Sequence, residues 1–270
     1  MQAFRSAVVV GMFVAAVSVP VGLNAQRGNR GGQAAAGPAK AAAPVDLTGY
    51  WVSVVTEDWR YRMVTPARGD HPSVPLNAAG NALANSWDPA KDEAAGDACK
   101  AYGAAGVMRA PGRLHITWQD DTTLKIDTEA GTQTRLLRFD PAGSQAAPAA
   151  EPNPPAQPTP STGQGRSVAQ WEFAGGARGG RGGARGGNLK VVTTNMRPGY
   201  LQKNGVPYSG NTVLTEYFSR TIEPNGDSWL ILTSIVEDPQ YLTGPFLRST
   251  HYKRLPDNST AWEPEECSSR

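Results

Sequence analysis

The sequence predicts a mainly β protein, a single antiparallel meander that closes into a barrel or forms a strongly curved sheet. Three observations support this prediction. Apolar and polar residues alternate with a period of two over most segments after residue 112, and tight polar turns separate these segments. Roughly nine or ten such segments follow one another with few interruptions, as in β-barrels. A two-sheet sandwich is the alternative architecture.

The first part of the folded region combines one strand with short helices. Residues 50–55 are rich in valine and aromatic side chains and are expected to form a strand, which 58–64 are expected to continue. Alanine-rich segments near 76–100 are predicted as short helices. Asp88 or a neighbouring residue is expected to cap the second helix.

The later strands are predicted from their alternation. In 113–119, for example, Leu114, Ile116 and Trp118 alternate with polar residues, which is typical of a strand with one face in water. The predicted strands from this point on are 113–119, 122–130, 133–140, 167–173, 189–196, 212–223, 227–238 and 246–255.

The first 25 residues predict export. They contain one positive charge at Arg5, an apolar run from 7 to 19, and a small residue, Ala25, after which cleavage of a signal peptide is expected. The apolar run is short for a membrane span, and no later segment approaches the required length, so no membrane span is expected in the mature chain. The expected location is periplasmic or extracellular.

Low-complexity segments divide the remaining chain. Residues 26–45 are rich in glycine and alanine and are predicted to be a flexible tether. A single β domain is expected over 46–270, with disordered loop inserts at 141–166 and 174–188. Because predicted strands resume after each insert, one domain accounts for the sequence.

The second insert contains Arg178, Arg181 and Arg185 between glycines, a composition also found in segments that bind RNA. It lacks the aromatic residues that such segments usually carry, and the protein is expected to be exported. We therefore interpret it as an elongated hairpin loop. Lengthening a loop from about two to 16 residues costs only ~1.8 kcal/mol in closure entropy.

Charge argues against a nucleic-acid partner. The net charge is +2, but eight of the 26 Lys and Arg residues and one of the 24 acids lie in 1–45, 141–166 and 174–188. The remaining chain therefore has a net charge of −5. Nucleic-acid-binding domains usually have their positive charge on the folded surface.

The chain has two cysteines, Cys99 and Cys267. In an oxidising compartment, an even pair far apart in sequence predicts one disulfide, which would tie the C-terminus to the middle of the chain. Two cysteines without a nearby histidine pair make a poor metal site, so no metal and no cofactor are expected.

One set of residues carries a resemblance to a known family. The set is Cys99, Pro111, Gly112, Arg113, Gln133, Arg135, Trp171, Glu172, 189–195, 214–218, 235–246 and Cys267. On these residues the chain resembles a widespread, uncharacterised family of secreted, β-rich bacterial proteins of the acidobacterial type. This resemblance implies a fold and a compartment and no particular reaction. In that family a tight turn joins the Trp-Glu strand to the following strand, where this chain has its glycine–arginine run. The resemblance to lipocalin-like barrels is looser and rests on strand count alone.

Candidate site residues come from polar positions on the predicted strands. The chain shows no metal-ligand spacing among its three histidines and no nucleophile or phosphate-binding motif. If the sheet closes, alternate side chains point into a lumen, where a polar ligand site is a hypothesis. Its members would be His115, Arg135, Glu216 and His251. The alternative is that these residues face solvent or form a buried, mutually satisfied pair.

Three functions remain open at this stage. The leading hypothesis is a β-barrel that binds a small, partly apolar molecule. The first alternative is a hydrolase-like or isomerase-like enzyme that uses Glu216 with a histidine, and the second is a structural or envelope-interaction protein. The sequence predicts neither the ligand nor the oligomeric state.

Overall fold

A computed structural model describes residues 38–139, 160–173, 186–257 and 262–270, all within one compact unit, 36–270. The predicted signal peptide, most of the tether, and most of the two inserts lie outside the described residues.

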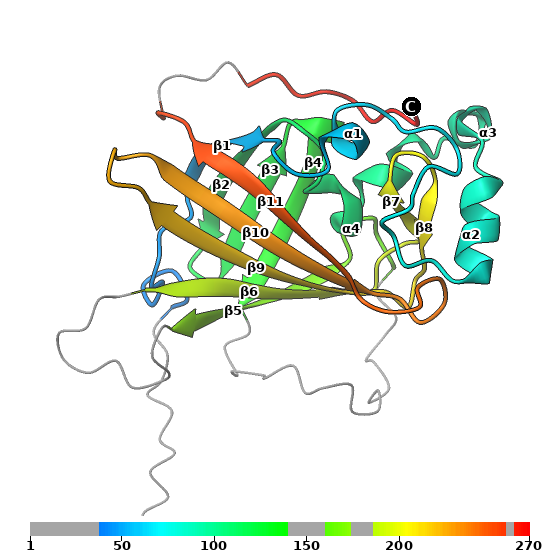
Figure 1. Ribbon diagram of the computed structural model, residues 1–270. Helices are drawn as coiled ribbons and strands as arrows, with labels where there is room; N and C mark the ends of the chain where they lie inside the picture. Colours follow the sequence, from blue (N-terminus) through cyan, green and yellow to red (C-terminus); the bar gives the residue numbers. More distant parts are fainter. Residues whose placement is uncertain (1–37, 140–159, 174–185, 258–261) are drawn as a thin grey trace, which may run out of the picture. The chain divides into compact units, whose positions relative to one another are not determined.

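The described residues form a closed β-barrel of nine strands, which confirms the predicted fold class (Figure 1). Around the barrel, the strands are β1 (Gly49–Val54), β11 (Phe246–Arg254), β10 (Ser228–Glu237), β9 (Val213–Ile222), β6 (Gly187–Thr194), β5 (Arg166–Phe173), β4 (Gln133–Phe139), β3 (Thr123–Thr128) and β2 (Arg113–Asp120).

Strand β1 closes the barrel because it pairs on both sides. Trp51 lies opposite Leu114 of β2 and opposite Arg254 of β11.

Neighbouring strands are antiparallel except β4 and β5, which are parallel, with Leu137 opposite Ser167. The barrel is therefore not a pure antiparallel meander. Residues 140–165 separate the two parallel strands, which is long enough for the crossover connection that a parallel pair requires.

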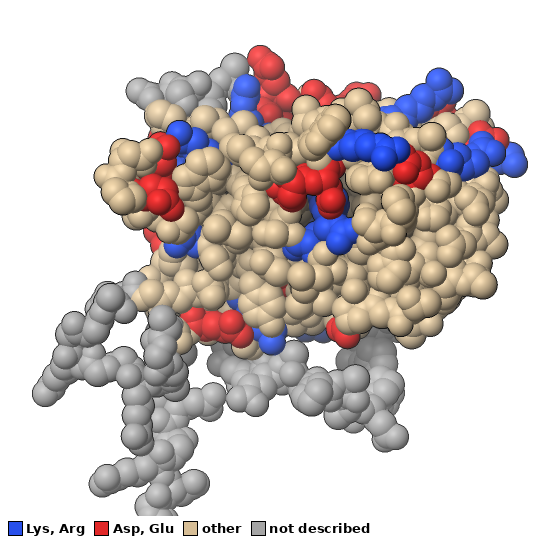
Figure 2. All heavy atoms as spheres, viewed as in Figure 1, with Lys and Arg blue, Asp and Glu red and all other residues tan. Residues whose placement is uncertain are grey.

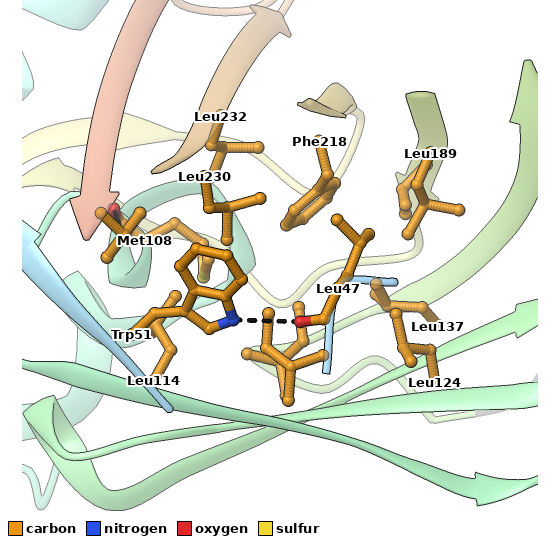
Figure 3. Close-up of a cluster of buried hydrophobic side chains, with 14 of the residues drawn as sticks. Leu47, Trp51, Met108, Leu114, Leu124, Leu137, Leu189, Phe218, Leu230 and Leu232 are labelled. Atoms are coloured by element: carbon orange, nitrogen blue, oxygen red, sulfur yellow. Dashed lines mark hydrogen bonds between the residues drawn. The ribbon is translucent and has the colours of Figure 1, made fainter. Parts of the chain in front are cut away.

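Apolar side chains fill the barrel interior. Trp51, at 0 % exposure, belongs to this cluster, and its indole nitrogen donates to the carbonyl of Leu47 at 3.0 Å (Figure 3). The cluster arises from the predicted alternation, because every second residue of each strand points inward. Among its members are Leu114, Ile116, Leu124, Ile126, Leu137, Leu189, Val191, Phe218, Leu230, Leu232 and Tyr252.

A second, smaller core lies beside one end of the barrel, where short helices and a two-stranded sheet gather (Figure 1). It includes Leu214, Val236 and Phe246, from the start of β9, the end of β10 and the start of β11. The surrounding elements are α2 (Ala78–Asn85), α3 (Pro89–Ala94), η1 (Ala98–Tyr102), α4 (Ala104–Val107), β7 (Gly199–Gln202) and β8 (Val206–Tyr208). A further short helix, η2 (Ala130–Thr132), joins β3 to β4.

The predicted helices near 76–100 are confirmed as α2, α3 and most of η1. The Asp88 cap is also confirmed, because its carboxylate accepts a hydrogen bond from the backbone of Ala90 at 3.1 Å. The strand expected to continue over 58–64 is wrong: α1 (Trp59–Arg62) is a short helix. Its Arg62 side chain is buried and donates to the carbonyl of Arg109 at 2.8 Å. This tertiary contact overrides the local preference for strand.

Parts of the predicted tether and the first insert belong to the folded unit. The Trp171 indole donates to the carbonyl of Ala39 at 2.8 Å, so backbone order begins before residue 46. The backbone of Ala104 donates to the carbonyl of Gly163 at 2.9 Å, so order also resumes before residue 166.

The strands on either side of the glycine–arginine run pair with each other, as predicted. Phe173 at the end of β5 lies opposite Gly187 at the start of β6, in an antiparallel hairpin. The run itself, at 174–185, lies outside the described residues.

Cys99 and Cys267 form the predicted disulfide, with Cα atoms 5.0 Å apart and a separation of 168 positions in sequence. The C-terminal segment also has its own backbone contacts with the barrel. The backbone of Glu265 donates to the carbonyl of Glu129 at 2.9 Å, and its own carbonyl accepts from the Thr132 hydroxyl at 2.9 Å.

We expect the double substitution Cys99→Ser and Cys267→Ser to lower the free energy of unfolding by about 5 kcal/mol, because the bond closes a very long loop. For a chain of this size the loss corresponds to a fall in Tm of about 10–20 °C. Urea unfolding and calorimetry of both proteins measure it. An unchanged Tm would contradict the view that the bond stabilises the fold.

Candidate functional site

Arg135 and Glu216 meet inside the barrel. Glu216 shares the inward face of β9 with Leu214 and Phe218, and Arg135 shares that of β4 with Leu137. The guanidinium donates from Nη1 to Oε1 of Glu216 at 2.8 Å and from Nη2 to Oε2 at 2.5 Å. The two side chains are 0 % and 1 % exposed. This two-point geometry is the strongest form of an Arg–carboxylate pair.

A neighbouring phenol adds a polar group to this part of the lumen. Tyr252, also fully buried, donates from its hydroxyl to the carbonyl of Met108 at 2.5 Å. Burial raises the pKa of Tyr252 to about 12, so the phenol stays protonated as a donor. Nε of Arg135 is buried and has no hydrogen-bond partner among the described residues. Both carboxylate oxygens of Glu216 are used by Arg135.

His115 lies on the outer face of the barrel. Its neighbours Leu114 and Ile116 point inward, so the histidine side chain points outward. The imidazole stacks on the ring of Tyr50 with centroids 4.0 Å apart, and Trp262 lies at 6.3 Å. Desolvation in this aromatic contact lowers the pKa of His115, which favours the neutral ring.

His251 also lies on the outer face, because its neighbours on β11, Thr250 and Tyr252, are buried and point inward. Its Nδ1 lies 3.2 Å from Oε2 of Glu57 and 3.2 Å from the hydroxyl of Thr56. These contacts link the end of β1 to β11.

The structure therefore brings together only two of the four residues proposed for a lumen site. Arg135 and Glu216 form a buried two-point ion pair, while His115 and His251 lie outside. The hypothesis that all four meet in the lumen is wrong. The physical reason is the phase of the alternation, which puts each histidine on the face opposite to its apolar neighbours.

A pocket of about 350 Å³ opens at the barrel mouth, at the end away from the second core. We call it the mouth pocket. Segment 38–48, which precedes β1, forms one wall, and the ends of β2 and β5 and the start of β3 form the other. It is lined by Lys40, Ala43, Val45, Asp46, Leu47, Thr48, Trp118, Leu124 and Trp171.

Aromatic side chains dominate the strand side of the mouth pocket. Trp118 and Trp171 have ring centroids 6.4 Å apart, and Phe139 lies behind both, at 5.6 Å from Trp118 and 5.3 Å from Trp171. The Trp171 indole is fixed by its hydrogen bond to Ala39. Below them, Leu124 and Leu47 belong to the packed core. The mouth pocket thus presents flat apolar surface in a fixed arrangement.

A second pocket, of about 260 Å³, lies among the elements around the second core. Three of its polar side chains are already paired, because Asp92 accepts from Lys100 at 2.7 Å and from the Tyr200 hydroxyl at 2.8 Å. These contacts hold α3, η1 and β7 together. We therefore assign these polar side chains a structural role.

The sequence reasoning missed the mouth pocket. The sequence places Trp118 and Trp171 near the ends of two predicted strands. The missing information was that segment 38–48 packs against the same end, because its composition predicts a tether.

The charged side chains form no large patch of one sign on the face shown in Figure 2, where acidic and basic residues lie next to one another. Within the described ranges, no group of three or more His, Cys, Asp or Glu side chains could hold a metal ion. Of the helices described, none is both long and apolar enough to cross a membrane.

The fold and the site together define a closed, mainly antiparallel β-barrel with a packed interior and an aromatic pocket at one mouth. Comparison of the chain with protein-family models, curated proteins and solved structures found no match.

We expect Glu216→Gln to lower the free energy of unfolding by about 3–5 kcal/mol, because it leaves the Arg135 guanidinium charged and buried without a counter-ion. The double variant Arg135→Met with Glu216→Leu replaces both charges by apolar groups of similar size, and we expect it to be more stable than Glu216→Gln. Urea unfolding measures both. A double variant that is less stable than Glu216→Gln would contradict the assignment of the pair as a balanced, buried unit.

Proposed function

We propose that this protein is an exported binding protein for a small, partly apolar molecule, and that the mouth pocket is its ligand site. The observation that carries the proposal is an indole-lined hollow of about 350 Å³ over the packed end of a closed barrel. Barrel mouths are common ligand sites, and pockets of roughly 300–1,000 Å³ hold small ligands.

The lining indicates the chemistry of the ligand. The rings of Trp118 and Trp171 are tilted relative to each other and favour a ligand with a flat or cyclic apolar group. Asp46 is already engaged, since it accepts from the backbone and the hydroxyl of Thr48 at 2.9 and 2.7 Å. The exposed Lys40 adds a cation at the wall. A ligand with an apolar ring and one acceptor or anionic group fits this combination.

Export is supported by two features. The first 25 residues have the order of a cleavable signal peptide. Cys99 and Cys267 form a disulfide, a bond that persists mainly in oxidising compartments. The resemblance to secreted bacterial proteins agrees with both. We therefore place the mature chain in the periplasm or outside the cell.

The geometry favours binding over the two alternatives. An enzyme that uses Glu216 with a histidine needs the carboxylate free and the imidazole nearby. Here Arg135 occupies both carboxylate oxygens, and His115 and His251 lie on the outer face. A purely structural role does not account for an open pocket with two indoles at a barrel end.

The proposal is tested with N-phenyl-1-naphthylamine, a flat neutral dye that becomes fluorescent in apolar sites. We expect saturable binding of one dye per chain. Trp171→Ala is expected to weaken it by about tenfold or more, equal to ~1.4 kcal/mol, because it removes one ring face. The matched control is Trp59→Ala, which removes an indole that is 64 % exposed and lies outside the mouth pocket.

A second variant, Ala43→Phe, fills the mouth pocket without removing a packed side chain, and we expect it to block the dye while the Tm stays near that of the native protein. Equal dye binding by Ala43→Phe, Trp171→Ala and the native chain would contradict the assignment of the mouth pocket. Absence of saturable binding by the native chain would contradict the ligand class.

A further inference from the structure

We propose that a small cavity between α1, the residues after α4, and the β7–β8 turn binds one small monovalent anion, a halide ion or a carboxylate group of that size. The cavity has a volume of about 30 Å³, and its polar lining comes from Tyr61, Arg62, Arg109, Gln202 and Lys203. We call it the anion cavity. It shares no residue with the mouth pocket, so this inference is independent of the proposed function.

Buried polar atoms in the lining lack partners. Gln202 is 5 % exposed, and neither its Nε2 nor its Oε1 makes a hydrogen bond with any described residue. Arg109 is 8 % exposed, and its Nη1 is likewise without a partner in the described part of the chain. Leaving such groups unsatisfied destabilises the folded state, so native proteins normally pair them with protein, water or an ion.

Positive charge is in excess around the anion cavity. Arg109 donates to Asp58 at 3.1 Å, and Nε of Arg248 lies 2.9 Å from the same carboxylate. Arg62 pairs with Glu57. Three guanidiniums thus share two carboxylates.

The remaining charges agree with this excess. Lys203 lines the cavity and adds a fourth cation, with its ammonium 5.7 Å from the centre of the Tyr102 ring. Desolvation lowers the pKa of Arg109, and the charges of Arg248 and Arg62 lower it further against the opposing effect of Asp58. A bound anion would relieve the repulsion between these cations.

The size of the anion cavity selects among anions. One water molecule needs a space of about 10–15 Å³ in the same measure, so 30 Å³ admits about two heavy atoms. That space fits a halide ion or the two oxygens of a carboxylate. Phosphate and sulfate, each with five heavy atoms, are too large. Two water molecules also fit and would satisfy Gln202, but they would leave the positive charge without a counter-ion.

The test measures the Tm of the full mature chain in halide-free buffer with added sodium chloride, bromide, formate or sulfate at equal ionic strength. We expect chloride and bromide to raise the Tm saturably by about 2–4 °C beyond sulfate, as expected for about 1 kcal/mol of ligand stabilisation. A rise with formate alone would identify a carboxylate as the occupant, and a rise with halides alone would identify a free ion.

Gln202→Leu removes the unpaired amide at nearly constant volume and is expected to abolish the anion-specific rise. Gln170→Leu, at an exposed position on β5, is the matched control and is expected to keep it. If Gln202→Leu does not fold, Lys203→Gln provides the same test, with a weaker halide response expected because one cation is removed.

Crystals soaked in bromide give a direct readout. We expect one anomalous peak within hydrogen-bond reach of Gln202 Nε2 and Arg109 Nη1. If the bromide-soaked crystals show a water molecule at this position, the proposal is overturned. Equal Tm changes with all four salts would also overturn it. An anion-specific rise that persists in Gln202→Leu would also overturn it.

Discussion

The structure depends on the closure of the sheet by β1. Because β1 pairs with both β2 and β11, the barrel leaves no open edge at this point, and one set of alternating side chains is enclosed. Nine strands form an interior that side chains can fill, so an inward polar group must find its partner there. Arg135 and Glu216 satisfy this requirement across the lumen, from β4 and β9. Because the interior is packed, ligand binding is expected at the barrel mouth.

Much of the fold was predictable from residue alternation. Leu114 and Ile116 on β2, or Leu214 and Phe218 on β9, define an inward face without any structure. The same alternation of inward and outward positions places the Glu216 side chain inside the barrel and the His115 side chain outside it. The sequence therefore already implied that these two candidate residues lie on opposite faces of the sheet. The disulfide followed from the cysteine count together with the oxidising compartment that the signal peptide predicts.

Other features depend on contacts that no local pattern reveals. The helix α1 forms because the buried Arg62 reaches the carbonyl of Arg109, a residue far along the chain. Segment 38–45 has the composition of a linker, yet Ala39 accepts a hydrogen bond from Trp171. The parallel pairing of β4 with β5 is likewise not encoded by residue alternation. One wall of the mouth pocket is segment 38–48, so the mouth pocket was not predictable.

Hydrogen–deuterium exchange of the backbone amides of β1, Gly49–Val54, tests the closed barrel most directly. If β1 is held on both sides, its hydrogen-bonded amides exchange as slowly as those of β9 and β10, in the same cooperative unit. If these amides exchange as rapidly as those of an exposed edge strand, the sheet is open between β1 and a neighbour. A dry, enclosed interior would then be contradicted.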